Sequence, residues 1–336
     1  MKRWIQIVIG LLLVVLALVA WVGWASPSSR EPVYEGKLLS EWLRYADEPP
    51  SVSPAAKQAV QAIGRKAIPT LLRWLRAKDS FWAPTWNDPP WKQKLIAWGQ
   101  KHKFLALNPV PARLRQRQGE LGFICLGIEA KEALPDIIDV YQRATAVSSQ
   151  WAAASVIGSL GPAAREAIPA LIRGVGHTNL DMRAKALETL GQIQSEPRLV
   201  LPVLVSSLSD PNPNVRFSAV RAIADFGDQA KPIVPALVRS LEDPDLNTRV
   251  ITISTLANLQ TDPDSVVPAL TRTLNEDPDK FVRTDAAMAI GYFGEQAKSA
   301  IPALVNARKS QAADGQAITR ALRKIDPQSM VETGDH

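Results

Sequence analysis

The chain has 336 residues, of which 46% are hydrophobic and 21% charged, with one cysteine and a formal charge of +6. This composition excludes a disordered chain, a collagen-like chain and a small disulfide-stapled domain, and the length suits one large domain or two ordinary ones. The charge is uneven, because residues 1–120 carry 18 Lys and Arg against 8 Asp and Glu, whereas residues 121–336 carry 21 against 25. Basic surface is therefore expected mainly in the first 120 residues.

An almost wholly apolar run at residues 4–25 follows Lys2 and Arg3. As a helix it would extend about 33 Å, enough to cross a hydrocarbon core of about 30 Å. We expect a single-pass transmembrane anchor at residues 4–25, with residues 1–3 cytoplasmic and the rest of the chain extracytoplasmic, in the periplasm or at the cell surface. The alternative is a cleavable signal peptide, although this run is longer than the usual apolar region of one. Residues 26–33 would then form a linker.

A proline motif recurs through the remainder of the chain. Its prolines follow one another at intervals of 66, 34, 33, 33, 33 and 34 residues. Proline suits the first turn of a helix, and the apolar residues after it have helical spacing. Asp-Pro turns such as Asp210-Pro211 end this first helix, and a second helix follows that ends at a glycine such as Gly227. No stretch alternates like a strand, so the pattern predicts an all-α fold. The prolines are Pro69, Pro135, Pro169, Pro202, Pro235, Pro268 and Pro302.

The combination of apolar-Pro-Ala-Leu, Asp-Pro turn, Val-Arg and Ala-x-Ala-(Ile/Leu)-x-x-x-Gly resembles HEAT repeats over about residues 53–310. The opening segment, Tyr34 to Leu43, resembles the leader of membrane-anchored or secreted bacterial HEAT-repeat proteins. The resemblance implies an α-solenoid of about seven helical hairpins, which we place at residues 34–327 with a flexible tail at 328–336. It also implies that the second helices line a concave surface that holds a protein partner.

A basic, tryptophan-rich insertion is expected at about residues 77–119, because the first proline interval equals two repeat lengths. Between Pro89 and Gly119 there is no acidic residue. The insertion is either a surface-seeking element for anionic lipid or an acidic partner, or a cap over the open end of the stack. Nucleic acid is not expected as a partner outside the cytoplasm. The candidate surface residues are Lys92, Lys94, Trp98, Lys101, Lys103, Arg113, Arg115 and Arg117.

Arginines recur once per repeat at Arg183, Arg216, Arg249 and Arg283. We expect them to fix the stacking by reaching an aspartate or a carbonyl of a neighbouring turn, because a contact repeated in each unit serves all units equally. The positions five and nine residues after each arginine instead differ in chemistry, and we expect them to bind the partner, with Arg221 and Tyr292 as anchors. These positions are Glu188, Gln192, Arg221, Asp225, Ser254, Asn258, Met288 and Tyr292.

The sequence offers no recognisable catalytic constellation. The three histidines have no partner at metal-ligand spacing, and Cys125 lies in an apolar helix where it is expected to be a buried small hydrophobe. We therefore expect a non-catalytic scaffold without cofactor or metal. Because some HEAT-like proteins attach bilins to light-harvesting proteins, a lyase-type or chaperone-like accessory protein that uses the groove is the alternative.

Overall fold

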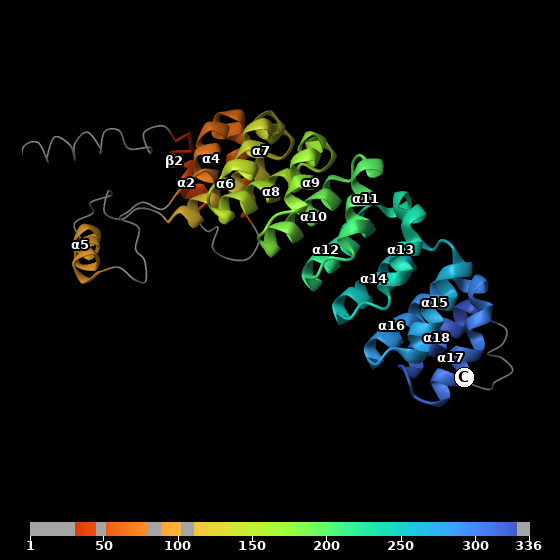
Figure 1. Cartoon of the computed structure of the whole chain (residues 1–336). Helices are drawn as coiled ribbons and strands as arrows, with labels where there is room; N and C mark the ends of the chain where they lie inside the picture. Colours follow the sequence, from red (N-terminus) through yellow and green to blue (C-terminus); the bar gives the residue numbers. More distant parts are fainter. Residues whose placement is uncertain (1–30, 45–51, 79–88, 102–110, 328–336) are drawn as a thin grey trace, which may run out of the picture. The chain divides into compact units, whose positions relative to one another are not determined.

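The computed structural model describes residues 31–44, 52–78, 89–101 and 111–327, and these are almost entirely helical (Figure 1). The chain divides into two compact units, residues 1–160 and residues 161–336. In both units, a first helix that carries the repeat proline pairs with a second helix to form a hairpin. The described residues contain seven such hairpins, as the repeat pattern predicted.

Unit 1 begins with a small N-terminal cap. Strands β1 (Val33–Tyr34) and β2 (Lys37–Leu38) form an antiparallel pair that leads into the short helix α2 (Leu39–Trp42). Alternation in the sequence does not predict these strands, because each has only two residues. The remaining helices of unit 1 are α3 (Pro54–Ile63), α4 (Ile68–Leu75), α5 (Pro90–Lys101), α6 (Ala112–Leu126), α7 (Leu134–Arg143) and α8 (Val147–Ser159), with the hairpins α4/α6 and α7/α8.

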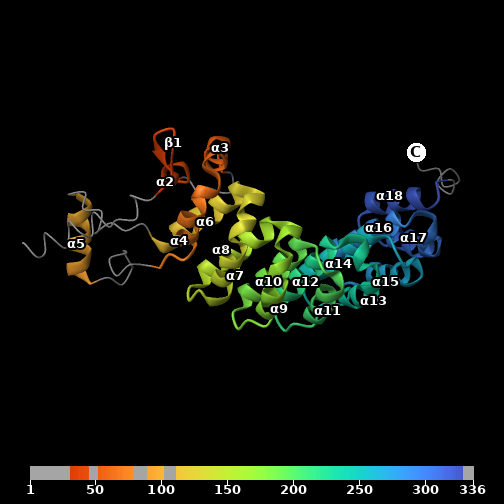
Figure 2. The same cartoon turned by 90° about the horizontal axis from the view of Figure 1, so that it is seen from above.

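Unit 2 consists of five hairpins in sequence order, α9/α10 to α17/α18 (Figures 1 and 2). Each second helix contacts the second helix of the next hairpin, so that α10, α12, α14, α16 and α18 lie side by side. The helices are α9 (Ile168–Val175), α10 (Leu180–Ile193), α11 (Pro197–Ser207), α12 (Pro213–Asp225), α13 (Val234–Ser240), α14 (Leu246–Leu259), α15 (Pro263–Glu276), α16 (Lys280–Tyr292), α17 (Ile301–Lys309) and α18 (Gly315–Ile325).

Local sequence explains where these helices begin and end. The side chain of Asp245, which precedes α14, accepts a hydrogen bond from the Thr248 N–H and satisfies a donor that the helix cannot. After α12, Gly227 has a φ of 52°, a conformation that glycine adopts at little cost. The leucines of the proline motif form the core, since Leu237 and Leu270 are fully buried.

Small residues set the spacing between neighbouring second helices. A Cβ on Gly191 of α10 would lie 2.8 Å from the Ala222 Cα of α12, and one on Gly291 of α16 would lie 2.7 Å from the Ala321 Cα of α18. Real Cβ atoms do not approach so closely. The glycine near the end of the second helix therefore permits close helix contact.

The long proline interval reflects an interruption inside one hairpin. Helices α4 and α6 pair with each other although residues 76–111 separate them. The Gln116 amide on α6 donates to the Ala77 carbonyl at 2.7 Å and so joins the two ends of the interruption. Residues 112–119, which the sequence analysis assigned to the insertion, belong to helix α6.

The N-terminal cap is fixed to α6 by buried polar contacts. The Gln118 amide donates to the carbonyls of Ser40 and Leu43, both at 3.3 Å. Glu31, with 3% of its side chain exposed, lies 3.7 Å from Arg115. Residue 31 therefore helps to anchor this segment to the stack, although the sequence analysis placed it in a linker.

The expected single-pass membrane location is contradicted. Within the ranges that the structure describes, no helix combines the length and apolarity that crossing a bilayer requires. The predicted anchor at residues 4–25, residues 1–3 and the predicted tail at 328–336 lie outside the described residues.

Candidate binding surface

The recurring arginines form a ladder of buried ion pairs within unit 2. The Arg216 guanidinium donates from Nε and Nη2 to the two carboxylate oxygens of Asp243, both at 2.7 Å, and from Nη1 to the Asp210 carbonyl at 3.0 Å. Asp210 in turn receives Arg183 of the preceding repeat at 3.0 and 3.1 Å. Each arginine thus connects the turn of its own hairpin to the next one, as expected.

The next arginine of the ladder, Arg249, repeats this arrangement, and the last one, Arg283, does not. Arg249 binds the Asp277 carboxylate at 2.7 and 3.1 Å, whereas Arg283 reaches only carbonyls, those of Asp277 and Ala312. The hydrogen bond to Asp243 raises the pKa of Arg216. Burial acts to raise the pKa of Asp210, but the Arg183 guanidinium and the Asn212 N–H outweigh it and lower that pKa. These arginines are therefore committed to the stack.

The positions expected to bind a partner lie on the opposite, exposed side of the same helices. Seven of the eight are exposed and Glu188 is half-buried. They are distributed over four helices that lie side by side, with two positions on each of α10, α12, α14 and α16. We call these eight positions the second-helix face: Glu188, Gln192, Arg221, Asp225, Ser254, Asn258, Met288 and Tyr292.

At the α10–α12 end, this face carries charged groups close together. Asp225 lies over the backbone of Gly191, and its pKa is raised by burial and by Glu188 although Arg221 opposes the shift. Glu188 accepts a hydrogen bond from Gln192 at 3.1 Å and lies 3.4 Å from Lys185. The polar groups at this end already interact with one another.

At the α16–α18 end, the face is aromatic and basic. Tyr292 is 53% exposed and Met288 38% exposed, and the Lys324 ammonium lies 3.9 Å from the Tyr292 ring centroid. On α18, Arg320, Arg323 and Lys324 are exposed and have no ion-pair partner among the described residues. The sequence analysis missed them because the arginine register ends at Arg283, but counting from the helix-capping Asp314 places Arg323 at the corresponding position.

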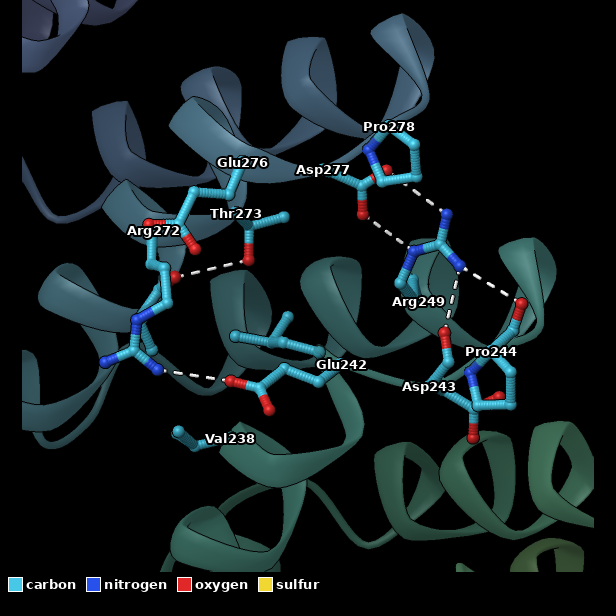
Figure 3. Close-up of a pocket in the computed structure, with 12 residues that line it drawn as sticks. Val238, Glu242, Asp243, Pro244, Arg249, Arg272, Thr273, Glu276, Asp277 and Pro278 are labelled. Carbon is cyan, nitrogen blue, oxygen red and sulfur yellow. Dashed lines mark hydrogen bonds and ion pairs between the residues drawn. The ribbon is translucent and has the colours of Figure 1, made fainter.

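A cavity of about 420 Å³ opens between the α13–α14 turn and α15 (Figure 3). The ladder pair Arg249–Asp277 forms one wall of the cavity (Figure 3). A second ion pair, between Glu242 and Arg272 at 3.1 Å, also lines it. Arg249 also donates to the carbonyls of Asp243 and Pro244. The Arg249 guanidinium therefore directs most of its N–H donors to acceptors within the protein.

The residues of the predicted insertion surface separate into two groups. On α5, Trp98 is 48% exposed, Lys94 and Lys101 are exposed, and Lys92 is buried. Lys103 lies outside the described residues. The basic residues on α6 are Arg113, Arg115 and Arg117.

Two of the α6 arginines make contacts inside unit 1. Arg115 stacks 5.2 Å from the Trp74 ring centroid and pairs with Glu31, and Arg117 lies 2.9 Å from Glu120. Burial is the main cause that lowers the Arg115 pKa. Only Arg113 of these three is exposed. Among the described insertion residues, Arg115 and Arg117 are therefore held by contacts within unit 1 and are not part of a free basic surface.

The single cysteine is unsuited to act as a nucleophile. Cys125 is 3% exposed, and burial raises the pKa of its thiol to about 11. The thiolate, which is the reactive form, is therefore scarce at neutral pH. The described residues also contain no group of three or more His, Cys, Asp or Glu side chains that could hold a metal ion.

Comparisons with known proteins agree with this architecture. Family models for HEAT repeats match residues 200–230 and 234–323. The Escherichia coli protein YibA is 16% identical with a TM-score of 0.52, covering 85% of this chain and 91% of that one. A chain of the Kap95:Nup1 complex is 13% identical with a TM-score of 0.56, covering 87% of this chain and 39% of that one. At these identities, the likeness concerns the fold alone.

A lyase complex is also among the similar structures. The complex of CpcE and CpcF of phycocyanin lyase from Nostoc sp. PCC7120 is 25% identical over 47% of this chain and 98% of that one, but its TM-score of 0.39 supports no argument about activity. No curated protein matched. The repeat motif, the hairpin stack, the arginine ladder and the family models agree that the chain contains HEAT repeats, which the family models match within residues 200–323.

Proposed function

We propose that this HEAT-repeat protein is a non-catalytic scaffold that binds a protein partner on the second-helix face of unit 2. The observation that carries the proposal is a division of roles on the same helices. The ladder arginines bind acceptors of neighbouring turns. The positions five and nine residues later lie on the exposed side of the same helices, all but one of them exposed, and their residue type changes from repeat to repeat. Exposed side chains that differ from repeat to repeat, carried by a regular stack of hairpins, are suited to recognise one partner.

The α16–α18 end is the strongest anchor point of this face. Tyrosine, tryptophan and arginine dominate the energetics of protein interfaces. Here an exposed Tyr292 contacts Lys324 of α18, and the same helix carries the exposed Arg323. A partner that covers Tyr292 and Met288 would bring its own polar groups to these cations. We therefore propose a partner segment that presents carboxylates at this end, since unpaired cations complement acidic side chains.

Site-specific photocrosslinking in the full chain tests the location. A photoreactive residue at Asn258 or Tyr292 should crosslink to one common partner. The same residue at Arg239, which is exposed on the first helix α13, is the matched control and should not crosslink to it. Crosslinking only from Trp98 on α5 would move the working surface to the insertion and refute the proposal.

Substitutions then measure the contribution of each anchor. Arg221→Ala and Tyr292→Ala should each weaken the recovered complex by about 1–2 kcal/mol, or roughly 5–30-fold, with the melting temperature almost unchanged because both side chains are exposed. Arg239→Ala should leave the affinity unaltered. Normal binding by both anchor variants would show that the face is not used.

A further inference from the structure

Unit 1 contains a small crevice where α4, α7 and the start of α8 meet. Its volume is about 210 Å³. Its lining includes Ala144, Ala146 and Ser149, together with basic residues that follow α4 and end α7. By position in the repeat, it corresponds to the larger cavity of unit 2 in Figure 3. The two sites differ in one respect that concerns the ladder.

In unit 2, the corresponding place is filled by a carboxylate. Asp277 accepts hydrogen bonds from Arg249 and, at 2.9 Å, from the Asp279 N–H. Counted from the repeat prolines, alanine replaces both aspartates in unit 1, with Ala144 at the position of Asp277 and Ala146 at that of Asp279. The crevice therefore lacks the carboxylate around which this turn is built.

The arginine of the ladder is missing from the same place. Gln116 stands at the position of Arg249, and its amide makes the bond to the Ala77 carbonyl that the arginine makes to the Asp243 carbonyl. The same amide donates to the Ser149 hydroxyl oxygen at 2.9 Å. The Ser149 hydroxyl oxygen is thus the acceptor in this bond, and its O–H remains available to donate to another group.

Two donors in the crevice have no acceptor among the described residues. Ser149 is only 2% exposed and lines the crevice, yet its hydroxyl donates to no described group. The Ala146 N–H at the start of α8 donates to no described group, whereas the equivalent Asp279 N–H in unit 2 donates to the Asp277 carboxylate. A buried donor without an acceptor costs free energy, so this arrangement favours a bound acceptor.

The rim of the crevice is positively charged. Arg76, Lys78 and Arg143 line it together with a single acid, Asp139. Asp139 lies 3.2 Å from Arg143 and 3.7 Å from Arg76, and Arg76 also pairs with Asp136 outside the lining at 2.8 Å. Lys78 has no ion-pair partner among the described residues. The rim therefore attracts an anion.

We propose that this crevice binds an oxyanion, either a carboxylate or a phosphate group, in the place of the missing ladder aspartate. The anion accepts hydrogen bonds from the Ser149 hydroxyl and the Ala146 N–H at the start of α8, where the helix dipole also favours negative charge. Lys78 and Arg143 balance its charge from the rim. The site is separate from the second-helix face and does not depend on it.

Calorimetric titration of the full chain with sodium phosphate and with sodium succinate, at constant ionic strength set by sodium chloride, tests the proposal. We expect saturable binding of at least one anion, and the stronger of the two identifies the ligand as a phosphate or a carboxylate. Ser149→Ala and Lys78→Gln should each weaken binding by about tenfold, the loss of one hydrogen bond to a charged group. Lys78 is exposed, so its variant retains the fold.

The decisive variant is Ala144→Asp, which returns a carboxylate to the crevice. It should abolish binding of either anion while keeping the helical spectrum. Ser207→Ala is the matched control, because Ser207 is a buried serine of unit 2 that already donates to the Val203 carbonyl, and its affinity should equal that of the wild type. Absence of saturable binding by the wild type, or unchanged affinity in Ala144→Asp, would overturn the proposal.

Discussion

Removing one aspartate from the ladder should destabilise unit 2 far more than removing a surface ion pair. In the Arg249–Asp277 pair, only 10% of the arginine side chain and 4% of the aspartate side chain are exposed. Asp277→Ala leaves the buried guanidinium with two unmade charge-assisted hydrogen bonds and also deprives the Asp279 N–H of its acceptor. Breaking a buried pair in this way costs about 3–5 kcal/mol.

The matched control is the pair between Arg272 and Glu242, in which the side chains are 61% and 72% exposed. Arg272→Gln should cost less than about 1 kcal/mol, because water screens an exposed pair and competes for its hydrogen bonds. Urea unfolding of the full chain followed by circular dichroism, together with hydrogen exchange of the α14 and α16 amides, measures both variants. Equal losses in the two variants would refute the argument from burial.

Unit 1 lacks both members of the buried ion pair, because it has Gln116 and Ala144 where unit 2 has Arg249 and Asp277. Removing both charges together should therefore be better tolerated than removing one. The double variant Arg249→Gln/Asp277→Ala removes both charges. It should therefore cost less than the sum of the two single variants, with a coupling energy of about 1–3 kcal/mol. Strict additivity would mean that the two side chains stabilise the stack independently of each other.

Three further outcomes follow from burial, spacing and charge. Leu270→Ala should lower the free energy of unfolding by about 2–5 kcal/mol in urea titrations, because Leu270 is fully buried and its truncation leaves a cavity. Gly191→Leu should lower it by about 1–3 kcal/mol, because a Cβ there would lie 2.8 Å from the Ala222 Cα. The pKa of Asp210 is lowered in the folded protein, so its ionised carboxylate stabilises the fold above its ordinary pKa of about 3.8. This stabilisation is lost as the pH falls through the lower folded-state pKa. Asp210→Asn should therefore remove this part of the acid dependence of the melting temperature, measured in melting curves at different pH.

The repeat architecture could be predicted because its signals are local and recur. Proline at the start of the first helix, an Asp-Pro turn and a glycine after the second helix each fix a backbone position, and the seven repeat prolines leave one register. The arginine ladder followed from the same spacing. The repeat spacing therefore predicts the hairpins of unit 2 and the order in which they stack.

Features that occur once were beyond such reasoning. The N-terminal cap formed by β1, β2 and α2 is held by contacts between distant residues, such as Gln118 with Ser40 of α2, which no periodic pattern predicts. The interruption of the α4/α6 hairpin likewise became clear only when Gln116 was found to reach Ala77. The membrane location, predicted from the hydropathy of residues 4–25 and from Lys2 and Arg3, was wrong, because no helix among the described residues is long and apolar enough to cross a membrane.

The ladder also explains why the binding positions are free to vary. Each rung holds two successive turns through side-chain and backbone acceptors, as Arg216 does with Asp243 and Asp210, so the spacing of neighbouring hairpins does not depend on the exposed side of the second helix. Charged, polar and aromatic side chains can therefore follow one another there without loss of the stack. Where the rung is absent, at Gln116 and Ala144, the stack is held by an uncharged contact, and the space that the carboxylate would fill remains as a crevice with cations at its rim. The repeat thus offers two kinds of surface, an exposed face where the ladder is intact and an enclosed site where it is interrupted.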